Sequence, residues 1–238
     1  MVIVPLLAVA FDAQGIDTNH ILHLAVGTAM ASIVFTSLSS MRAHASRNSV
    51  RWDIVLRMTP GILLGSIVGT YLAKYLPTRV LAIYFAGFVF LMAINMLVDL
   101  KPKGSKLVLE FKGLSAAGFI ISGLSALIAM GGAVLTVPLM LYMEVSMVQA
   151  IGTAAAIGFP IAVGGTAGYF AAGSGVTQLP PLSFGYVYLP ALGGIAVASI
   201  FMAPFGAHLA HKLPAKLLRK IFAVLLCALA MKMLVSLW

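Results

Sequence analysis

The stretch Gly69-Thr-Tyr-Leu-Ala-Lys-Tyr-Leu-Pro77 occurs a second time in this chain, in altered form, as Gly206-Ala-His-Leu-Ala-His-Lys-Leu-Pro214, an offset of 137. Two further matches keep the same order. Ala25-Val-Gly-Thr-Ala29 matches Ala150-Ile-Gly-Thr-Ala154 at an offset of 125, and Val4-Pro-Leu6 matches Val137-Pro-Leu139 at an offset of 133. Three ordered matches whose offsets differ only by loop lengths indicate one structural unit that is present twice.

The composition places this duplicated unit in a membrane. Of 238 residues, 61% are apolar and 9% are charged, and the mean hydropathy is +1.07. A water-soluble domain carries about 25% charged residues, so a soluble globule and a disordered chain are both excluded. The single cysteine, Cys227, excludes a disulfide scaffold. We therefore expect an all-α, polytopic membrane protein, with the lipid bilayer as its surroundings and a cell membrane, in bacteria the inner membrane, as its location.

Apolar runs long enough to cross a bilayer need about 20 residues. Seven runs qualify, and one short stub, Val2 to Phe11, precedes them. The predicted spans are His20–Met41, Ile54–Tyr75, Val80–Val98, Leu114–Tyr142 with an interruption near Gly131-Gly132, Met147–Ala172, Phe184–Leu209 and Leu217–Leu237. Gly61, Gly65 and Gly69 form a ridge of small residues that favours close helix packing.

These spans predict two four-helix repeats, residues 1–100 and 113–238, joined by a basic loop, residues 101–112. An even number of helices per unit gives both units the same orientation, so we expect parallel repeats, unless a re-entrant segment changes the count. The match at Val4-Pro5 also predicts that about one half-span is missing before it, through a late start or a truncation.

Residues Ala129 to Pro138 give the main candidate site. Two adjacent glycines weaken a helix, and Pro138 removes a backbone donor. A helix that restarts inside the membrane presents unpaired N–H groups, which attract anions. The alternative is a glycine-packed crossing with a kink. For the Gly-Thr pairs the sequence leaves open whether the hydroxyls bind substrate or their own backbone. The candidate substrate-binding residues are Gly131, Gly132, Ala133, Thr136, Pro138, Gly152, Thr153, Pro5, Gly27 and Thr28.

The charged residues favour an anionic ligand. Every acidic residue falls in or beside a predicted loop, whereas cation-coupled carriers usually keep a carboxylate inside a span. The net charge of +9 fits basic loops beside anionic lipid, so we expect no nucleic-acid partner. No catalytic motif is present, and His20/His23 and His208/His211 lack acidic or cysteine partners, so we expect no enzyme activity, no metal and no cofactor.

A glycine-rich break that runs into Val-Pro-Leu, followed by an Ile/Val-Gly-Thr motif and duplicated in two halves, resembles the TauE/SafE family of sulfite exporters over essentially the whole chain. Its Gly-x-Gly-Gly-Gly motif stands here as Ala129-Met-Gly131-Gly132-Ala133, with two glycines replaced by alanine. The resemblance implies secondary transport of sulfite, a sulfonate or a related sulfur-containing organic anion.

Two other classes of function stay open at this point. A membrane scaffold or accessory subunit would bind a partner and transport nothing, and an anion channel would show no saturable, coupled flux. The basic residues divide eight against six between the two membrane sides, so the positive-inside rule gives no orientation. A homo-oligomer also stays open.

Overall fold

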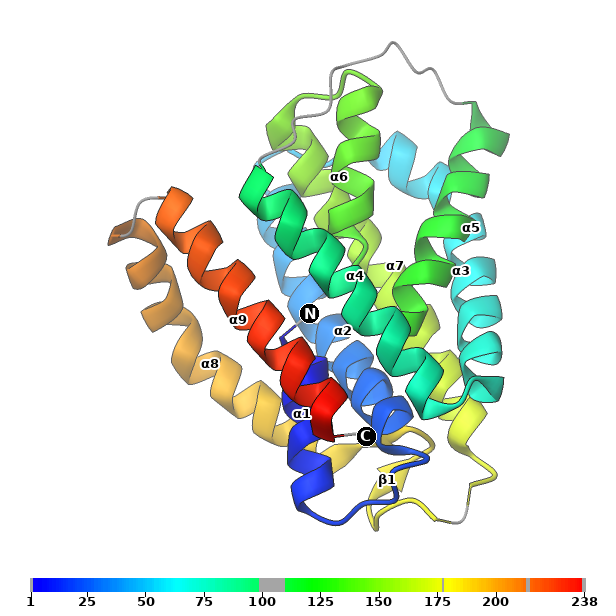
Figure 1. Ribbon diagram of the computed structural model, residues 1–238. Coiled ribbons are helices and arrows are strands. Elements are labelled where there is room, and N and C mark those ends of the chain that lie inside the picture. Colours follow the sequence, from blue (N-terminus) through cyan, green and yellow to red (C-terminus); the bar gives the residue numbers. More distant parts are fainter. Residues whose placement is uncertain (1, 99–109, 177, 213–214, 237–238) are drawn as a thin grey trace.

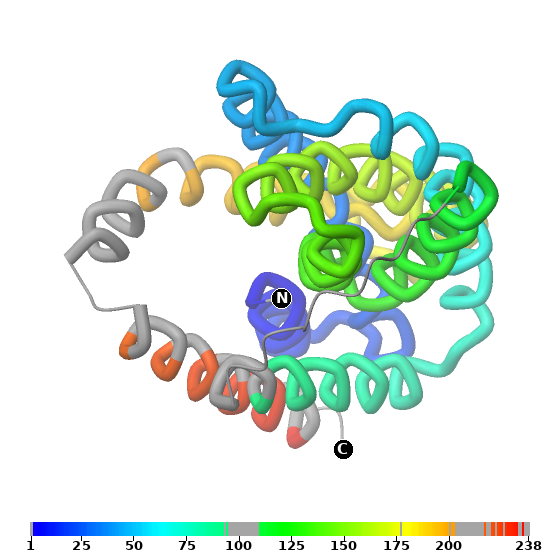
Figure 2. The backbone as a smooth tube through the Cα atoms, turned by 90° about the horizontal axis from the view of Figure 1, so that it is seen from above, coloured from blue at the N-terminus to red at the C-terminus, as the bar shows by residue number. Residues whose placement is uncertain are grey.

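The computed structural model describes residues 2–98, 110–176, 178–212 and 215–236, and there it is a bundle of helices with one short hairpin (Figure 1), seen from above in Figure 2. The helices are α1 (Ile3–Ala13), α2 (Ile21–Ala45), α3 (Trp52–Tyr75), α4 (Thr78–Val98), α5 (Phe111–Ile128), α6 (Ala133–Tyr142), α7 (Met147–Gly173), α8 (Leu189–Lys212) and α9 (Ala215–Ser236). The strands β1 (Ser183–Phe184) and β2 (Val187–Tyr188) pair antiparallel between α7 and α8. The predicted all-α class is confirmed.

Four helices in the described ranges, α2, α3, α5 and α7, are long and apolar enough to cross a membrane. Shorter apolar stretches lie in α4, α8 and α9, and α1 is the short stub that the sequence predicts. These helices therefore form a multi-pass membrane protein, as the sequence predicts. The Lys-rich connection, residues 101–109, lies outside the described residues, and the domain boundaries stay a prediction.

Glycines set the tightest helix contact, between α3 and α5. A side chain at Gly61 would meet the backbone of Ser115, and one at Gly65 would meet the backbone of Phe119. Only a residue without a side chain allows two helix backbones to approach this closely. The prediction that the glycine ridge of α3 serves packing is confirmed.

The interrupted span is a re-entrant pair of helices, not one crossing. α5 lies along α3 in the same direction and begins near the end of the bundle that holds the α2–α3 connection. After the break, α6 returns toward that same end, where α7 begins, and Gly152 of α7 packs on Ser49 of the α2–α3 connection (Figure 1). The sequence predicted a single broken span here because residues 114–142 are apolar throughout.

This re-entrant pair reverses the second repeat. The repeat makes α2 and α7 equivalent, and the two helices pack side by side. Gly27 lies against Tyr169, near the start of α2, whereas Ser37, further along, lies against Gly158, earlier in α7. The two equivalent helices are therefore antiparallel. The prediction of parallel repeats is wrong, and the contacts are those of inverted units related by an axis in the membrane plane.

Inversion also redistributes the charges. The α2–α3 and α6–α7 connections and the start of α5 lie at one end of the bundle, which we call the basic end. In its described part this end carries Arg42, Arg47, Arg51, Arg57 and Lys112. The opposite end, called the hairpin end, holds the β1–β2 hairpin with Lys74 and Arg79. The positive-inside rule then predicts that the basic end faces the cytoplasm.

Single cysteines test this topology, because Cys227 is the chain's one natural cysteine. In a Cys227→Ser background, we expect Arg47→Cys and Ser146→Cys to react with a membrane-impermeant thiol reagent from the cytoplasmic side, and Gln178→Cys from the other side. All three positions are exposed. Labelling is compared between right-side-out and inside-out vesicles. Parallel repeats would instead make Arg47→Cys and Gln178→Cys react from the same side of the membrane.

Candidate functional site

The break between α5 and α6 is a tight turn in left-handed backbone. Ala129 has φ 47° and Gly132 has φ 72°, and the N–H of Met130 donates to the Ser125 carbonyl over 3.1 Å. Gly132 caps α6, and its conformation is one that glycine adopts without strain. The glycine at this position is therefore required by the turn as well as by the space around it.

The N-terminus of α6 points into the interior of the bundle. Its depth in the bundle follows from its contacts with α7. Gly131 packs on Gly158 and Gly132 packs on Ile161, and these two α7 residues lie near the middle of that long helix. In the described part of the chain the N–H groups of Ala133 and Val134 make no hydrogen bond. Unpaired N–H groups and the helix dipole together give this end a positive potential at mid-membrane depth.

Thr136 and Pro138 shape α6 itself. The Thr136 hydroxyl is fully buried and donates to the Gly132 carbonyl over 2.8 Å, so its proton closes the first turn of the helix. Pro138 has no N–H and leaves the Val134 carbonyl without its usual donor. Gly131, Gly132, Ala133, Thr136 and Pro138, which are close in sequence, thus lie in and beside the break.

The first unit contains a corresponding half-helix, α1. Pro5 lies in its first turn, where a missing N–H costs no hydrogen bond, and is buried. The N-terminal residue of α1, Ile3, lines the same cavity as Ser32 and Thr36 near the middle of α2. α1 therefore also begins at mid-membrane depth, and it runs toward the hairpin end while α6 runs toward the basic end (Figure 1).

The Gly152-Thr153 pair holds the α2–α3 connection. A side chain at Gly152 would collide with the Ser49 carbonyl, so only glycine allows this approach. The fully buried Thr153 hydroxyl accepts a hydrogen bond from the backbone N–H of Arg51, at 3.0 Å. A residue pair of the second unit thus fixes a connection of the first unit.

The Gly27-Thr28 pair makes the same contact in reverse. Gly27 packs on the Tyr186 carbonyl, and the buried Thr28 hydroxyl accepts from the Tyr188 N–H at 3.0 Å. Tyr186 and Tyr188 follow the Ser49 and Arg51 of the other contact by 137 residues, the offset of the first repeat match. We call these two reciprocal contacts the Gly-Thr clamps.

The clamps lie at opposite ends of the bundle, one at the basic end and one at the hairpin end. The ten predicted site residues therefore do not form one constellation. The break residues lie together, Pro5 lies on the other half-helix, and the four clamp residues join the two units through their backbones. In the structure the clamp hydroxyls accept from backbone N–H groups of the other unit, whereas the two alternatives from the sequence were a bond to substrate and a bond to their own backbone.

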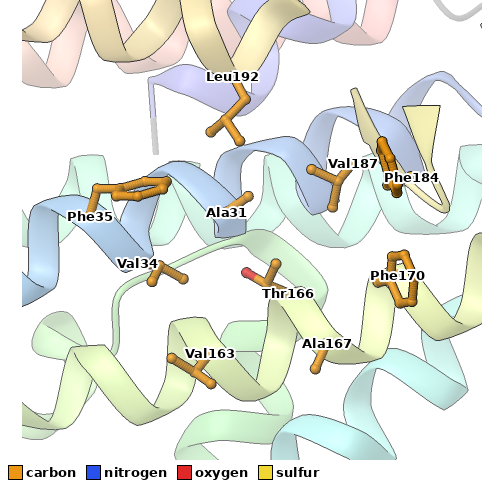
Figure 3. Close-up of a pocket in the computed structure, with 10 residues that line it drawn as sticks. All are labelled: Ala31, Val34, Phe35, Val163, Thr166, Ala167, Phe170, Phe184, Val187 and Leu192. Atoms are coloured by element: carbon orange, nitrogen blue, oxygen red, sulfur yellow. The ribbon is translucent and has the colours of Figure 1, made fainter. Parts of the chain in front are cut away.

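Two cavities flank α2, separated by Phe35 and Leu192, which line both. The cavity in Figure 3 holds about 480 Å³ and lies between α2, α7, the hairpin and α8. Its lining is apolar apart from Thr166, whose hydroxyl donates to the Ala162 carbonyl over 2.7 Å. This cavity offers an anion no free donor.

The second cavity, of about 550 Å³, lies between α1, α2 and α8 and is lined by several hydroxyl groups. Sequence reasoning missed these residues. The signal was present, because Ser32, Thr36 and Ser40 recur every four residues along α2 with Ser39 beside them, which places them on one helix face.

Aromatic and histidine side chains gather at the hairpin end. The His23 Nε2–H donates to the Ala73 carbonyl over 2.9 Å, and the His23 ring lies 5.2 Å from that of Tyr186. The Tyr186 hydroxyl lies within hydrogen-bond distance of Nδ1 of His20, at 3.3 Å, and burial raises the pKa of Tyr186, so the phenol stays protonated. The two histidines thus hold the α7–α8 connection on α2. His208 and His211 lie outside the residues whose side chains the structure describes.

Comparison with known proteins decides the family. The family model of the sulfite exporter TauE/SafE matches residues 1–233. The chain belongs to the TauE/SafE family. A probable membrane transporter protein of Haemophilus influenzae is 30% identical over 235 residues, which cover 98% of this chain and 89% of that protein. The resemblance that the sequence motifs gave is confirmed.

More distant members have similar names. The probable membrane transporter protein YdhB of Bacillus subtilis is 30% identical over 159 residues, 64% of this chain and 65% of that protein. A probable membrane transporter protein of Methanocaldococcus jannaschii is 24% identical over 245 residues, with 98% of this chain and 86% of that protein covered. No solved structure matches the chain significantly. This TauE/SafE protein is therefore a membrane transporter by family.

The clamps give a test of stability. Thr28→Val and Thr153→Val remove the acceptor of a backbone N–H, and each should lower the free energy of unfolding by about 1–3 kcal/mol. Thr28→Ser and Thr153→Ser keep the acceptor and serve as controls. Denaturant titration of the purified protein in detergent measures the difference. Equal stability of the valine and serine variants would show that the clamps hold nothing together.

Proposed function

We propose that this TauE/SafE protein is a secondary transporter of small anions, with sulfite, sulfonates or related sulfur-containing organic anions as substrates. Membership of the family makes the chain a membrane transporter, and the family's description names a sulfite exporter. The proposal adds the chemical class of substrate and the place in the fold where an anion is bound.

The observation that carries the proposal is the pair of half-helices. α1 and α6 both begin at mid-membrane depth, one in each unit, beside the antiparallel α2 and α7. In transporters built from inverted repeats, substrate sites lie near the midplane at interrupted helices, and helix N-termini point at anionic groups. The same arrangement here favours an anion bound between the two units.

The distribution of charge supports a negative substrate. Among the described residues, Asp17, Glu110 and Glu144 lie outside the helices, Asp12 lies in the last turn of α1 and Asp53 lies in the first turn of α3, so none places a carboxylate at the N-terminus of either half-helix. An anion at mid-membrane therefore meets two helix N-termini without a repelling carboxylate. The cationic side chains of the basic end would raise the local concentration of anions at its mouth.

The inverted repeat also supplies a route to alternating access. α6 packs on α7 of its own unit, and α1 packs both on α2 of its own unit and on α9 of the other. Rocking of one unit against the other about the central contact would open the half-helix ends to one side of the membrane and then to the other. The two Gly-Thr clamps lie at the two ends where such rocking would be limited.

Flux into proteoliposomes tests the proposed function. We expect purified protein to give a saturable uptake of radiolabelled sulfite or of a small sulfonate, with competition between the two. Protein-free liposomes are the control. A flux that rises linearly with concentration would favour a channel, and the absence of any sulfur-anion flux in folded protein would favour a scaffold.

Replacement of Gly132 tests the break. Gly132→Val forces a side chain into left-handed backbone and against Ile161 Cδ1, which lies 2.5 Å from the position of an added Cβ. We expect the variant to remain in the membrane and to lose sulfite uptake, because the side chain crowds the N-terminus of α6. Gly87→Val is the matched control, since nothing lies within 4 Å of a Cβ added there. Normal sulfite uptake by Gly132→Val would show that the anion does not bind at this helix end.

A further inference from the structure

A row of hydroxyl groups faces the cavity between α1, α2 and α8. Ser32, Thr36, Ser39 and Ser40 come from α2, and Ser199 comes from the facing side of α8. The cavity extends along α2 from Ser32, near mid-membrane, to Ala43, close to the basic end. Its volume of about 550 Å³ is ample for a small oxyanion with several waters.

Ser32 is buried and its hydroxyl donates to the Ala29 carbonyl over 2.7 Å, whereas the hydroxyls further along the row are less constrained. Thr36 and Ser39 are exposed, although they belong to a helix whose N-terminal half is fully buried. The Thr36 hydroxyl reaches only backbone carbonyls of its own helix, at 3.2 and 3.4 Å, and in the described residues Ser39 and Ser40 make no side-chain hydrogen bond. At membrane depth, polar groups that face a cavity rather than lipid mark a wet path or a ligand site.

The half-helix α1 begins at the same cavity, because Ile3, at its N-terminus, is one of the lining residues. A helix N-terminus attracts negative charge, and hydroxyl groups donate to oxygen. The cavity therefore combines a positive helix end with a row of rotatable donors, which together suit an oxyanion better than a cation or an apolar molecule.

The corresponding place in the second unit is filled. At the repeat offset of 125, Thr36 corresponds to Ile161, which packs on Gly132 at the N-terminus of α6, and Ser32 corresponds to the buried Ile157. Ser40 corresponds to Gly165, which packs on Met30 of α2. The polar row thus belongs to one unit only, and the two halves of the repeat are not chemically equivalent.

We propose that this hydroxyl-lined cavity on α2 binds the transported oxyanion and forms its passage between mid-membrane and the basic end. The inference rests on the proposed anion transport and specifies where it occurs. The anion lies beside Thr36 and the N-terminus of α1, and exchanges hydroxyl donors along Ser39 and Ser40 as it moves toward the basic end.

Sulfite uptake by full-length variants in proteoliposomes tests the passage. We expect Thr36→Val, and the double variant Ser39→Ala/Ser40→Ala, to raise the half-saturating sulfite concentration about tenfold or more, because each loses donors to a charged ligand. Thr59→Val is the matched control, since the Thr59 hydroxyl also donates to its own helix, to Val55 over 2.7 Å, and lines neither cavity. Unchanged half-saturation in both cavity variants would overturn the inference.

Water access provides a second readout that does not depend on transport. In a Cys227→Ser background, Ser39→Cys should react from the basic end with a charged, membrane-impermeant methanethiosulfonate in the absence of sulfite, and Leu38→Cys, which lines neither cavity, should react far more slowly. An unreactive Ser39→Cys would overturn the passage. If Ser39→Cys reacts but Thr36→Val and Ser39→Ala/Ser40→Ala take up sulfite with unchanged kinetics, the cavity holds water or a lipid headgroup. That result would overturn anion binding in the cavity.

The outcomes separate this inference from the proposed function. If the unmodified protein moves neither sulfite nor a sulfonate, the proposed function fails, and the assignment of the cavity to the transported anion fails with it. If the unmodified protein transports sulfite while the cavity variants behave like Thr59→Val, only the passage is wrong.

Discussion

The antiparallel contact between α2 and α7 is the constraint on which the rest of the structure depends. These equivalent helices pack through small residues, Gly158 on Ser37 and Gly165 on Met30, and each carries a Gly-Thr pair that holds a connection of the other unit. Since the two clamps repeat the same hydrogen bond in opposite directions, the inverted relation of the units is fixed at both ends of the bundle. A glycine that touches a carbonyl and a threonine that accepts an N–H define a backbone contact that no larger residue could make.

The central pair of helices, α2 and α7, also determines where the two half-helices begin. α6 begins against the middle of α7, and α1 begins beside the middle of α2, so both positive helix ends lie at the depth where the two units meet. The units then differ in chemistry. Ile161 fills the space beside α6, whereas Thr36 leaves a hydroxyl-lined space beside α1. The proposed anion path follows this hydroxyl-lined cavity, which extends toward the end where the arginines gather.

Much of this architecture was visible in the sequence. The repeat matches, the spans, the short α1 and the break at Gly131-Gly132 all follow from apolar length and from glycine and proline placement. The orientation did not follow, because hydropathy counts apolar residues and cannot distinguish a crossing from a re-entrant pair. The decisive turn includes Ala129, a residue that gives no sign of left-handed backbone. The partners of Thr28 and Thr153 lie more than one hundred residues away in sequence, so no local pattern could identify the clamps. The hydroxyl row of α2 was visible, but its spacing alone does not separate a cavity lining from hydroxyls that bond their own backbone.

The position of a bound anion tests the account most directly. Selenite, the heavier analogue of sulfite, scatters X-rays anomalously, so crystals of the protein soaked with it would locate the anion without interpretation of weak density. The account predicts an anomalous peak at mid-membrane, beside Thr36 and the N-terminal turn of α1, that sulfite displaces. A peak confined to the arginines of the basic end, in protein that transports sulfite, would contradict it.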